Sequence, residues 1–255
     1  MSNILAIAHK ELKSYFSSPI AYIAIGLWAL LYGYFFFAIL NFFVRQSMQM
    51  NQFGPQALNL NQQLIRPLLQ NVTILILFLM PMVTMRTYSE EKRSGTIELL
   101  LTSPITDFQI VLGKFFGALS LYAVMLLVTL LHLGALYFYG GRPEWKPIIT
   151  SYIGLLLLGG CFVAIGLFVS SLTKNQMVAG VGTFVVLLLL WIINWMADSA
   201  GPWLGEIMRY LSITEHFDDF GKGVIDTKHL VFYLSVIVFG LFLTLKSVDS
   251  ERWRG

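Results

Sequence analysis

Six long apolar runs constrain the fold of this chain more than any other feature of its sequence. An α-helix needs about 20 mainly apolar residues to cross roughly 30 Å of hydrocarbon, and each run meets or approaches that length. The runs recur from end to end, which leaves no segment for a separate water-soluble fold. The expected spans are Pro19–Phe43, Leu68–Met85, Ile110–Phe138, Ser151–Leu172, Met177–Met196 and His229–Leu245.

The composition also indicates a membrane protein. Hydrophobic residues make up 56% of the chain and charged residues only 12%, whereas an average soluble domain has about 25% charged residues. We therefore expect an all-α polytopic membrane protein in which residues 1–255 form a single transmembrane domain. The net charge of +3 is ordinary for a protein with basic cytoplasmic loops, so no nucleic-acid partner is expected. Cys161 lies in an apolar run and is interpreted as a small buried side chain.

The distribution of basic residues predicts the orientation. If the N-terminus is cytoplasmic, ten of the 17 Lys and Arg residues fall on the cytoplasmic side and seven on the outer side. We expect a multi-pass protein of the inner (plasma) membrane with both termini in the cytoplasm. Residues 197–228 then form an outer segment. Because structureless loops of that length are uncommon, we predict short re-entrant or interfacial helices there.

The first 18 residues have the pattern of an amphipathic helix on the inner membrane surface. Apolar side chains such as Ala8 and Tyr15 share one arc at about 100° per residue, and Lys10 and Lys13 lie on the other side. Glu11 falls in or beside the apolar arc. Two interpretations follow: a basic residue or a protein partner meets its carboxylate, or the side chain extends to water.

A charged segment at residues 86–109 separates the second and third apolar runs. Gly95 interrupts the chain, residues 96–101 are predicted to form a short helix, and Pro104 disfavours helical geometry at the residue before it. This helix would lie parallel to the membrane as a cytoplasmic docking surface. The side chains expected to face the cytoplasm are those of Glu90, Glu91, Lys92, Arg93 and Glu98.

The start of the third span carries two further signals. Thr106 and Gln109 have the spacing of a capping box, which predicts that a helix begins between them. Lys114 lies near the entry of this span, and we expect its ammonium group to extend to the membrane interface.

The charged segment carries a family resemblance. Residues 90–104 read Glu-Glu-Lys-Arg-Ser-Gly-Thr-Ile-Glu-Leu-Leu-Leu-Thr-Ser-Pro, and Gly-Lys follows at 113 and 114. This pattern resembles the loop between the second and third helices of ABC-2 type transporter permeases, whose short coupling helix docks on an ATP-binding subunit. Residues 10–19, 170–176 and 212–223 resemble the gliding-motility-associated branch of that family.

The resemblance implies a permease subunit that is not itself an enzyme. ATP and Mg²⁺ would be bound by a separate ATP-binding subunit, with no cofactor in this chain, and the sequence contains no Gly-x-x-x-x-Gly-Lys-Ser/Thr loop. The other partners implied are the lipid bilayer and either a second permease copy or a related membrane subunit with an extracytoplasmic domain. Export or outward-directed mechanical work is the expected function.

The resemblance also implies the residues of the site. Those expected to couple to the ATPase are Glu90, Glu91, Arg93, Gly95, Thr96, Glu98, Leu99, Leu100, Pro104 and Lys174, and those of the interface helix are Lys10, Glu11 and Lys13.

Two other function classes stay open. The first is an ATPase-coupled scaffold that acts on an extracytoplasmic partner without moving a substrate. The second is an intramembrane enzyme, although neither His-Glu-x-x-His nor Gly-x-Ser-x-Gly occurs. His132 lies deep in a span and is interpreted as a buried histidine hydrogen-bonded to a nearby helix. Thr129 and Asn194 are expected to hydrogen-bond between helices, and the glycines of the fourth span, Gly159 and Gly166 among them, to permit close helix contact.

Overall fold

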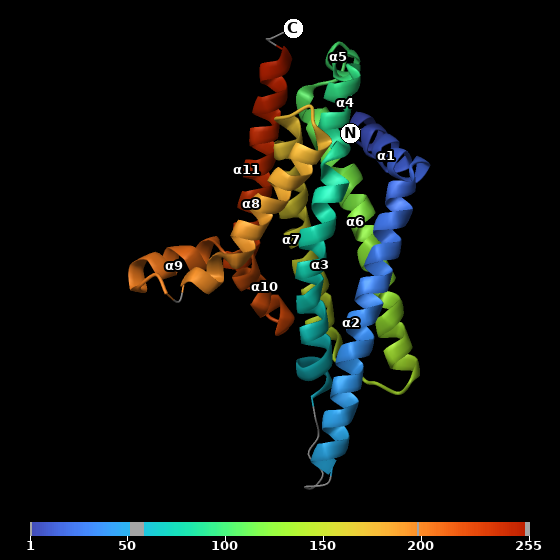
Figure 1. The fold of residues 1–255 in the computed structure, drawn as a ribbon, viewed down its shortest axis with the longest axis vertical. Coiled ribbons are helices and arrows are strands. Elements are labelled where there is room, and N and C mark those ends of the chain that lie inside the picture. Colours follow the sequence, from blue (N-terminus) through green and yellow to red (C-terminus); the bar gives the residue numbers. More distant parts are fainter. Residues whose placement is uncertain (1, 52–58, 198, 253–255) are drawn as a thin grey trace.

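The computed structural model describes residues 2–51, 59–197 and 199–252, except for the side chains of Ser2, Met50, Asn51, Leu100, Leu101 and Arg252. Every regular element in these ranges is a helix (Figure 1). The helices are α1 (Ser2–Ser17), α2 (Pro19–Asn51), η1 (Asn61–Ile65), α3 (Arg66–Thr84), α4 (Arg86–Ser94), α5 (Thr96–Leu101), α6 (Asp107–Phe138), α7 (Trp145–Ser171), α8 (Gln176–Ala197), α9 (Pro202–Leu211), α10 (Ile213–Gly221) and α11 (Thr227–Arg252).

Six of the described helical segments are long and apolar enough to cross a membrane, which confirms the predicted all-α fold with six spans. They are Pro19–Gln49, Asn61–Ser94, Asp107–Phe138, Trp145–Ser171, Gln176–Ala197 and Thr227–Glu251. Most extend past the predicted ends, because a helix continues into polar sequence as long as its backbone hydrogen bonds do. The capping box is present: the Thr106 side chain accepts from the Gln109 backbone, and the Gln109 side chain accepts from the Thr106 backbone.

The second span shows the largest extension. The helix does not end at Met85, whose backbone is helical and whose N–H donates to the carbonyl of Pro81 at 2.9 Å. Figure 1 shows α4 continuing the line of α3. An i,i+4 ion pair between Arg86 Nε and Glu90 Oε2, at 2.7 Å, supports the polar part of this helix. The charged residues 86–94 are therefore helical.

Helix α7 lies at the centre of the bundle and contacts α3, α6, α8, α10 and α11. Its glycines make this possible. A Cβ atom on Gly159 would lie 2.1 Å from the ring of Tyr122 on α6, and one on Gly166 would lie 2.2 Å from Oγ1 of Thr84 on α3. No larger residue fits at either position, which confirms the predicted close helix contact.

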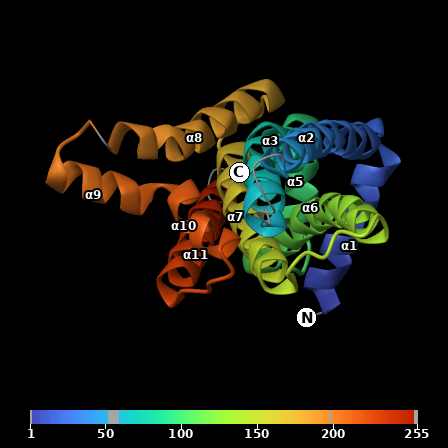
Figure 2. The same cartoon turned by 90° about the horizontal axis from the view of Figure 1, so that it is seen from below.

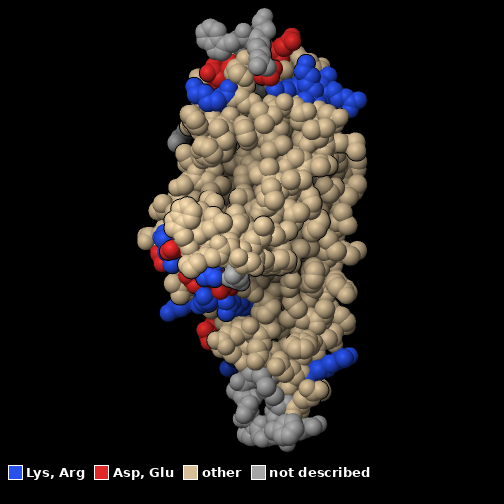
Figure 3. All heavy atoms as spheres, turned by 60° about the vertical axis from the view of Figure 1, so that its left-hand side comes forward, with Lys and Arg blue, Asp and Glu red and all other residues tan. Residues whose placement is uncertain are grey.

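The surface of the described bundle is largely apolar. Large side chains such as Leu30, Phe37 and Leu131 are uncovered by protein on α2 and α6. Figure 3 shows charged residues gathered at the end where α4 and α5 lie and again at a lower level, with a broad uncharged belt between them. Figure 2 shows α8 running away from the other helices and α9 running back beside it, after which α10 packs against α7 and α3. The segment predicted to hold short outer helices thus contains α9 and α10.

The polar residues of the spans give mixed outcomes. The Thr129 hydroxyl lies 2.6 Å from the Tyr152 hydroxyl, which confirms a contact between α6 and α7. The prediction for His132 was wrong: its Nδ1 is buried without a hydrogen-bond partner in the described residues, and the ring packs against Tyr32 and Phe36. Aromatic rings of α2 surround this histidine where a polar neighbour was expected.

Candidate functional site

Helix α5 stands at one extreme of the molecule, beyond the end of α4 (Figure 1). Gly95 makes the corner between the two helices with φ = 73°, a left-handed conformation that favours glycine. On α5, Ile97 is buried while Leu99 is 73% exposed. The predicted short helix is confirmed, with one apolar side chain anchoring it and another uncovered.

The predicted coupling residues divide into exposed and covered groups. The exposed group contains Arg93, Gly95, Thr96, Glu98, Leu99, Pro104 and Lys174, together with Lys10 and Lys13 of α1. Glu90 is half-exposed in its ion pair with Arg86. The side chain of Leu100 lies outside the described residues.

Two residues expected to face the cytoplasm do not. Lys92 is buried, and its Nζ lies 2.8 Å from Glu251 Oε1 of α11 while also donating to the carbonyl of Ser171. Glu91 is turned toward the bundle. The prediction was wrong for both because α4 is packed against α7 and α8 and has a covered face.

Lys114 is the centre of a buried ion cluster. Its Nζ lies 3.0 Å from Glu11 Oε1, 2.8 Å from Glu91 Oε1 and 2.9 Å from the carbonyl of Thr87. The residue is 1% exposed, so the expectation that its ammonium group reaches the interface was wrong. Three ligands satisfy the three N–H donors of the ammonium group, which is the condition for burying a charge at acceptable cost. We call Glu11, Glu91 and Lys114 the Lys114 cluster.

The Lys114 cluster joins three helices that are far apart in sequence: α1 through Glu11, α4 through Glu91 and α6 through Lys114. It also decides the open question about Glu11, which is 9% exposed and meets a basic residue rather than water. Lys10 adds an outer contact, with its Nζ 3.8 Å from Glu91 Oε1. The position of α1 relative to a membrane surface stays a prediction.

Two glycines of α6 that sequence reasoning did not single out for packing allow α1 to approach. A Cβ atom on Gly113 would lie 2.6 Å from Cβ of Ile7, and one on Gly117 would lie 2.6 Å from Cβ of Glu11. Their spacing, small-x-x-x-small, is the signal that was available in the sequence. Close contact at these glycines places the Glu11 carboxylate beside Lys114.

Further hydrogen bonds fix α4 to its neighbours. Ser170 Oγ on α7 accepts from the backbone N–H groups of Tyr88 and Ser89, at 3.1 and 3.2 Å, and donates to the carbonyl of Met85. The Tyr15 hydroxyl of α1 lies 3.3 Å from the Thr87 hydroxyl of α4. Helix α4 is therefore held from α1, α6, α7 and α11, while α5 projects from it. This arrangement suits the transfer of a force applied at α5 into the bundle.

Within the described residues, no group of three or more His, Cys, Asp or Glu side chains has the arrangement of a metal site. The chemistry of the α4–α5 end is that of a charged surface with an apolar side chain, Leu99, at its tip.

Comparisons with known proteins agree with this architecture. A family model described as ABC-2 family transporter protein matches residues 5–228. The chain is 27% identical over 145 residues to the probable multidrug ABC transporter permease YbhR of Escherichia coli strain K12, and equally to the protein of that name in Escherichia coli O157:H7. The alignment covers 56% of this chain and 38% of each relative, so less than half of their length is matched. The chain belongs to the ABC-2 family of transporter proteins and is a multi-pass membrane subunit of that kind.

Proposed function

We propose that this chain is the permease of an ATP-driven transporter in which a separate subunit hydrolyses ATP and docks on α5. One observation carries the proposal: α5 is exposed, while the helix from which it projects is clamped by the Lys114 cluster. A docking partner can push on such a helix without first having to order it. The family membership supports the same division of labour between membrane and ATP-binding chains.

The docking surface comprises exposed side chains of α4 and α5 and of the loop between α7 and α8. Arg93, Glu98 and Leu99 are exposed around the Gly95 corner, and Lys174 is exposed in the loop that leads into α8. Leu99 offers an apolar contact, and the charges around it would set the orientation of the partner. The Lys114 cluster has a positioning role beneath this surface, because its side chains face the bundle.

The direction of work and the remaining partners are the finer part of the proposal. The α4–α5 end is cytoplasmic, both termini lie on that side of the inner membrane, and the work is export or an outward-directed mechanical stroke. A second permease copy, or a related subunit with an extracytoplasmic domain as in the gliding-motility branch, completes the membrane part. A stroke that drives an outer partner without moving a substrate uses the same docking surface.

The test is the charge reversal Glu98→Arg. Because Glu98 is exposed and its side chain has no ion-pair partner in the described residues, the variant should fold and insert normally. We expect it to lose most of the stimulation that the permease gives to ATP hydrolysis by the co-purified ATP-binding subunit, measured in nanodiscs. The matched control is Glu206→Arg, the same change at an exposed residue of α9, which projects from the bundle away from α5 (Figure 1). Normal stimulation in Glu98→Arg, or equal loss in both variants, would overturn docking on α5.

A further inference from the structure

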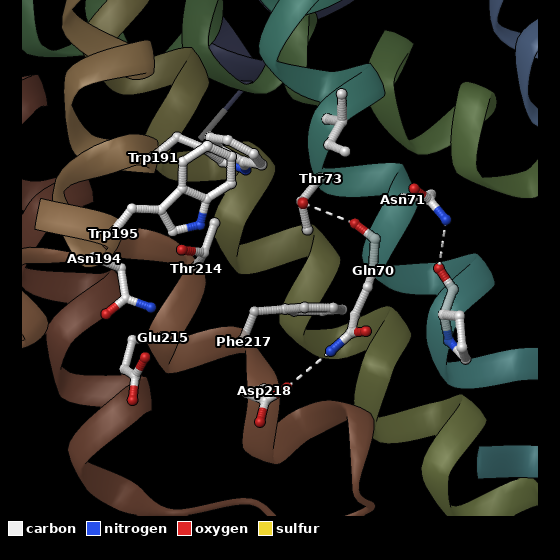
Figure 4. A pocket seen from close by; sticks show the side chains of 12 residues that line it. Gln70, Asn71, Thr73, Trp191, Asn194, Trp195, Thr214, Glu215, Phe217 and Asp218 are labelled. Carbon is white, nitrogen blue, oxygen red and sulfur yellow. Dashed lines mark hydrogen bonds between the residues drawn. The ribbon is translucent and has the colours of Figure 1, made fainter. Parts of the chain in front are cut away.

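A cavity of about 560 Å³ lies between α3, α8 and α10 (Figure 4). Its volume is in the range of small-molecule sites. Three elements far apart in the sequence build it, with Gln70 and Asn71 from α3, Trp191 and Trp195 from α8, and Glu215 from α10 among the lining residues.

The charge of the lining is one-sided. Two carboxylates, Glu215 and Asp218, line the cavity, and none of its lining residues is a Lys or Arg. Asp218 is already engaged: Arg66 Nη2 donates to both of its oxygens at 2.7 and 2.8 Å, and Gln70 Nε2 donates to Oδ1 at 2.8 Å. Glu215 has an exposed side chain whose carboxylate makes no ion pair in the described part of the chain. One full negative charge is therefore uncompensated at the cavity.

Aromatic rings supply the second part of the lining. The rings of Trp191 and Trp195 have centroids 5.1 Å apart and planes at 66°, so their faces meet at an angle. Phe217 lines the cavity from α10, and Figure 4 shows it between the tryptophans and Asp218. Indole faces attract cations through their quadrupole, and they also bury apolar groups.

We propose that this cavity is a binding site for an organic cation with an apolar or aromatic body. The cationic centre lies against the indole faces of Trp191 and Trp195 within reach of the Glu215 carboxylate, and the body fills the space beside Phe217. Asn194 and Gln70 are neutral hydrogen-bonding residues of the lining. An anion is disfavoured because Glu215 repels it and no lining cation offsets that repulsion.

The assignment of this cation as transported cargo rests on the proposed function, whereas binding itself does not. Binding is measured on the permease alone, without an ATP-binding subunit. Glu98 belongs to α5 and does not line the cavity, so Glu98→Arg should leave binding unchanged. Normal ATPase stimulation in Glu98→Arg, together with intact cation binding, would therefore count against docking on α5 and leave the cavity proposal standing.

The test uses a pair of probes that share one shape and differ in charge. Tetraphenylphosphonium is the cation and tetraphenylborate the anion, and each is titrated by equilibrium dialysis against the chain in phosphatidylcholine nanodiscs, with protein-free discs subtracted. We expect saturable binding of the cation only. Glu215→Gln should raise its dissociation constant about fivefold, because an ion pair with an exposed carboxylate supplies at most about 1 kcal/mol.

Matched variants separate the site from general effects. Glu206→Gln removes the same charge from α9, outside the cavity lining, and should change the dissociation constant less than twofold. Trp195→Leu keeps an apolar side chain but removes a ring face, and should weaken the cation about threefold or more. Three results would overturn the proposal: no saturable cation binding, equal effects of Glu215→Gln and Glu206→Gln, or saturable tetraphenylborate binding that is unaffected by Glu215→Gln.

Discussion

The α4–α5 end of the molecule and the region around α10, here called the α10 end, use charge in opposite ways. At the α4–α5 end, the Lys114 cluster is buried and each N–H of Lys114 has a ligand. At the α10 end, Lys222 is bound to Asp218 at 3.2 Å and to Asp219 at 2.8 Å, but these side chains are 31–45% exposed. Removing one member of a buried cluster leaves another charge buried without a partner. In an exposed network, water solvates a charge that loses its partner. Loss of a charged residue should therefore destabilise the α4–α5 end strongly and the α10 end only weakly.

The pKa values at the exposed end agree with this contrast. Hydrogen bonds from Lys222 and then His229 lower the pKa of Asp219 to about 2. For Asp218, burial raises the pKa, but the hydrogen bonds from Arg66 and Lys222 outweigh it and the net shift is downward. Both carboxylates are thus ionised at neutral pH, and their partners are redundant. Removing one basic residue leaves another in place.

The largest expected effect is from Lys114→Met. It leaves the Glu11 and Glu91 carboxylates without their cation in a covered site, and breaking a buried ion pair in this way costs about 3–5 kcal/mol. We expect the free energy of unfolding in detergent to fall by about that amount. The triple change Lys114→Met, Glu11→Gln and Glu91→Gln should recover much of it, because no unpaired charge remains.

The matched change at the other end is Lys222→Met. Its ion pairs are largely in solvent, so the loss should be less than about 1 kcal/mol. Equal destabilisation by Lys114→Met and Lys222→Met in the same unfolding assay would contradict the distinction between the two ends.

An effect between those of Lys114→Met and Lys222→Met is expected from Gly117→Ala. The added methyl group would lie 2.6 Å from Glu11 Cβ, which forces α1 away from α6 and weakens the Lys114 cluster. Overpacking of this kind costs about 1–3 kcal/mol, and protease cleavage within α1 should become faster. Gly134→Ala is the control, since it lies on the same helix and its methyl group would meet nothing within 4 Å. Both variants behaving alike would remove the close contact as the cause.

The smallest effect is a pH dependence confined to the α10 end. Burial lowers the pKa of His216 below its usual 6.5, so the folded state favours the neutral ring. The unfolded chain therefore binds more protons between that lowered pKa and 6.5, and stability falls as pH falls through this window. His216 Nδ1 also lies 2.6 Å from His229 Nδ1, where only one proton fits.

Amide hydrogen exchange tests this last prediction. Between pH 7 and pH 5, after correction for intrinsic rates, exchange at residues 212–221 should rise a few-fold, whereas residues 86–94 should show little change because the Lys114 cluster contains no histidine. His216→Gln does not titrate and should flatten the response. An equal rise at both ends would show that the effect is global.

The sequence predicted the parts of this fold that depend on local physics. Six apolar runs became six long helices, Gly95 became a left-handed corner, and Thr106 with Gln109 became a capping box. Each of these follows from hydrophobic length, backbone freedom or a three-residue spacing. The span ends were the least accurate, because the i,i+4 pairing of Arg86 with Glu90 carries a helix past its apolar part.

Long-range pairing could not be predicted in the same way. Lys114 and Glu11 are 103 residues apart, and only the packing of α1 at Gly113 and Gly117 brings them together. The burial of Lys92 was missed for the same reason, because its partner Glu251 belongs to the last helix and lies far away in the sequence. The cavity forms only where α3, α8 and α10 pack together, and no local sequence pattern predicts that packing. The aromatic pair Trp191 and Trp195 has i,i+4 spacing and was the one available hint.

The single helical run Asn61–Ser94 reaches from the Gly95 corner to the neighbourhood of the cavity. Its 34 residues make a rod about 50 Å long, at roughly 1.5 Å per residue. A tilt of about 5° about one end would sweep the other through about 4 Å over that length. Gln70, near the far end, holds Asp218 through one hydrogen bond of 2.8 Å, which such a sweep would break. The two ends are thus joined by one lever, with no relay of side chains needed between them.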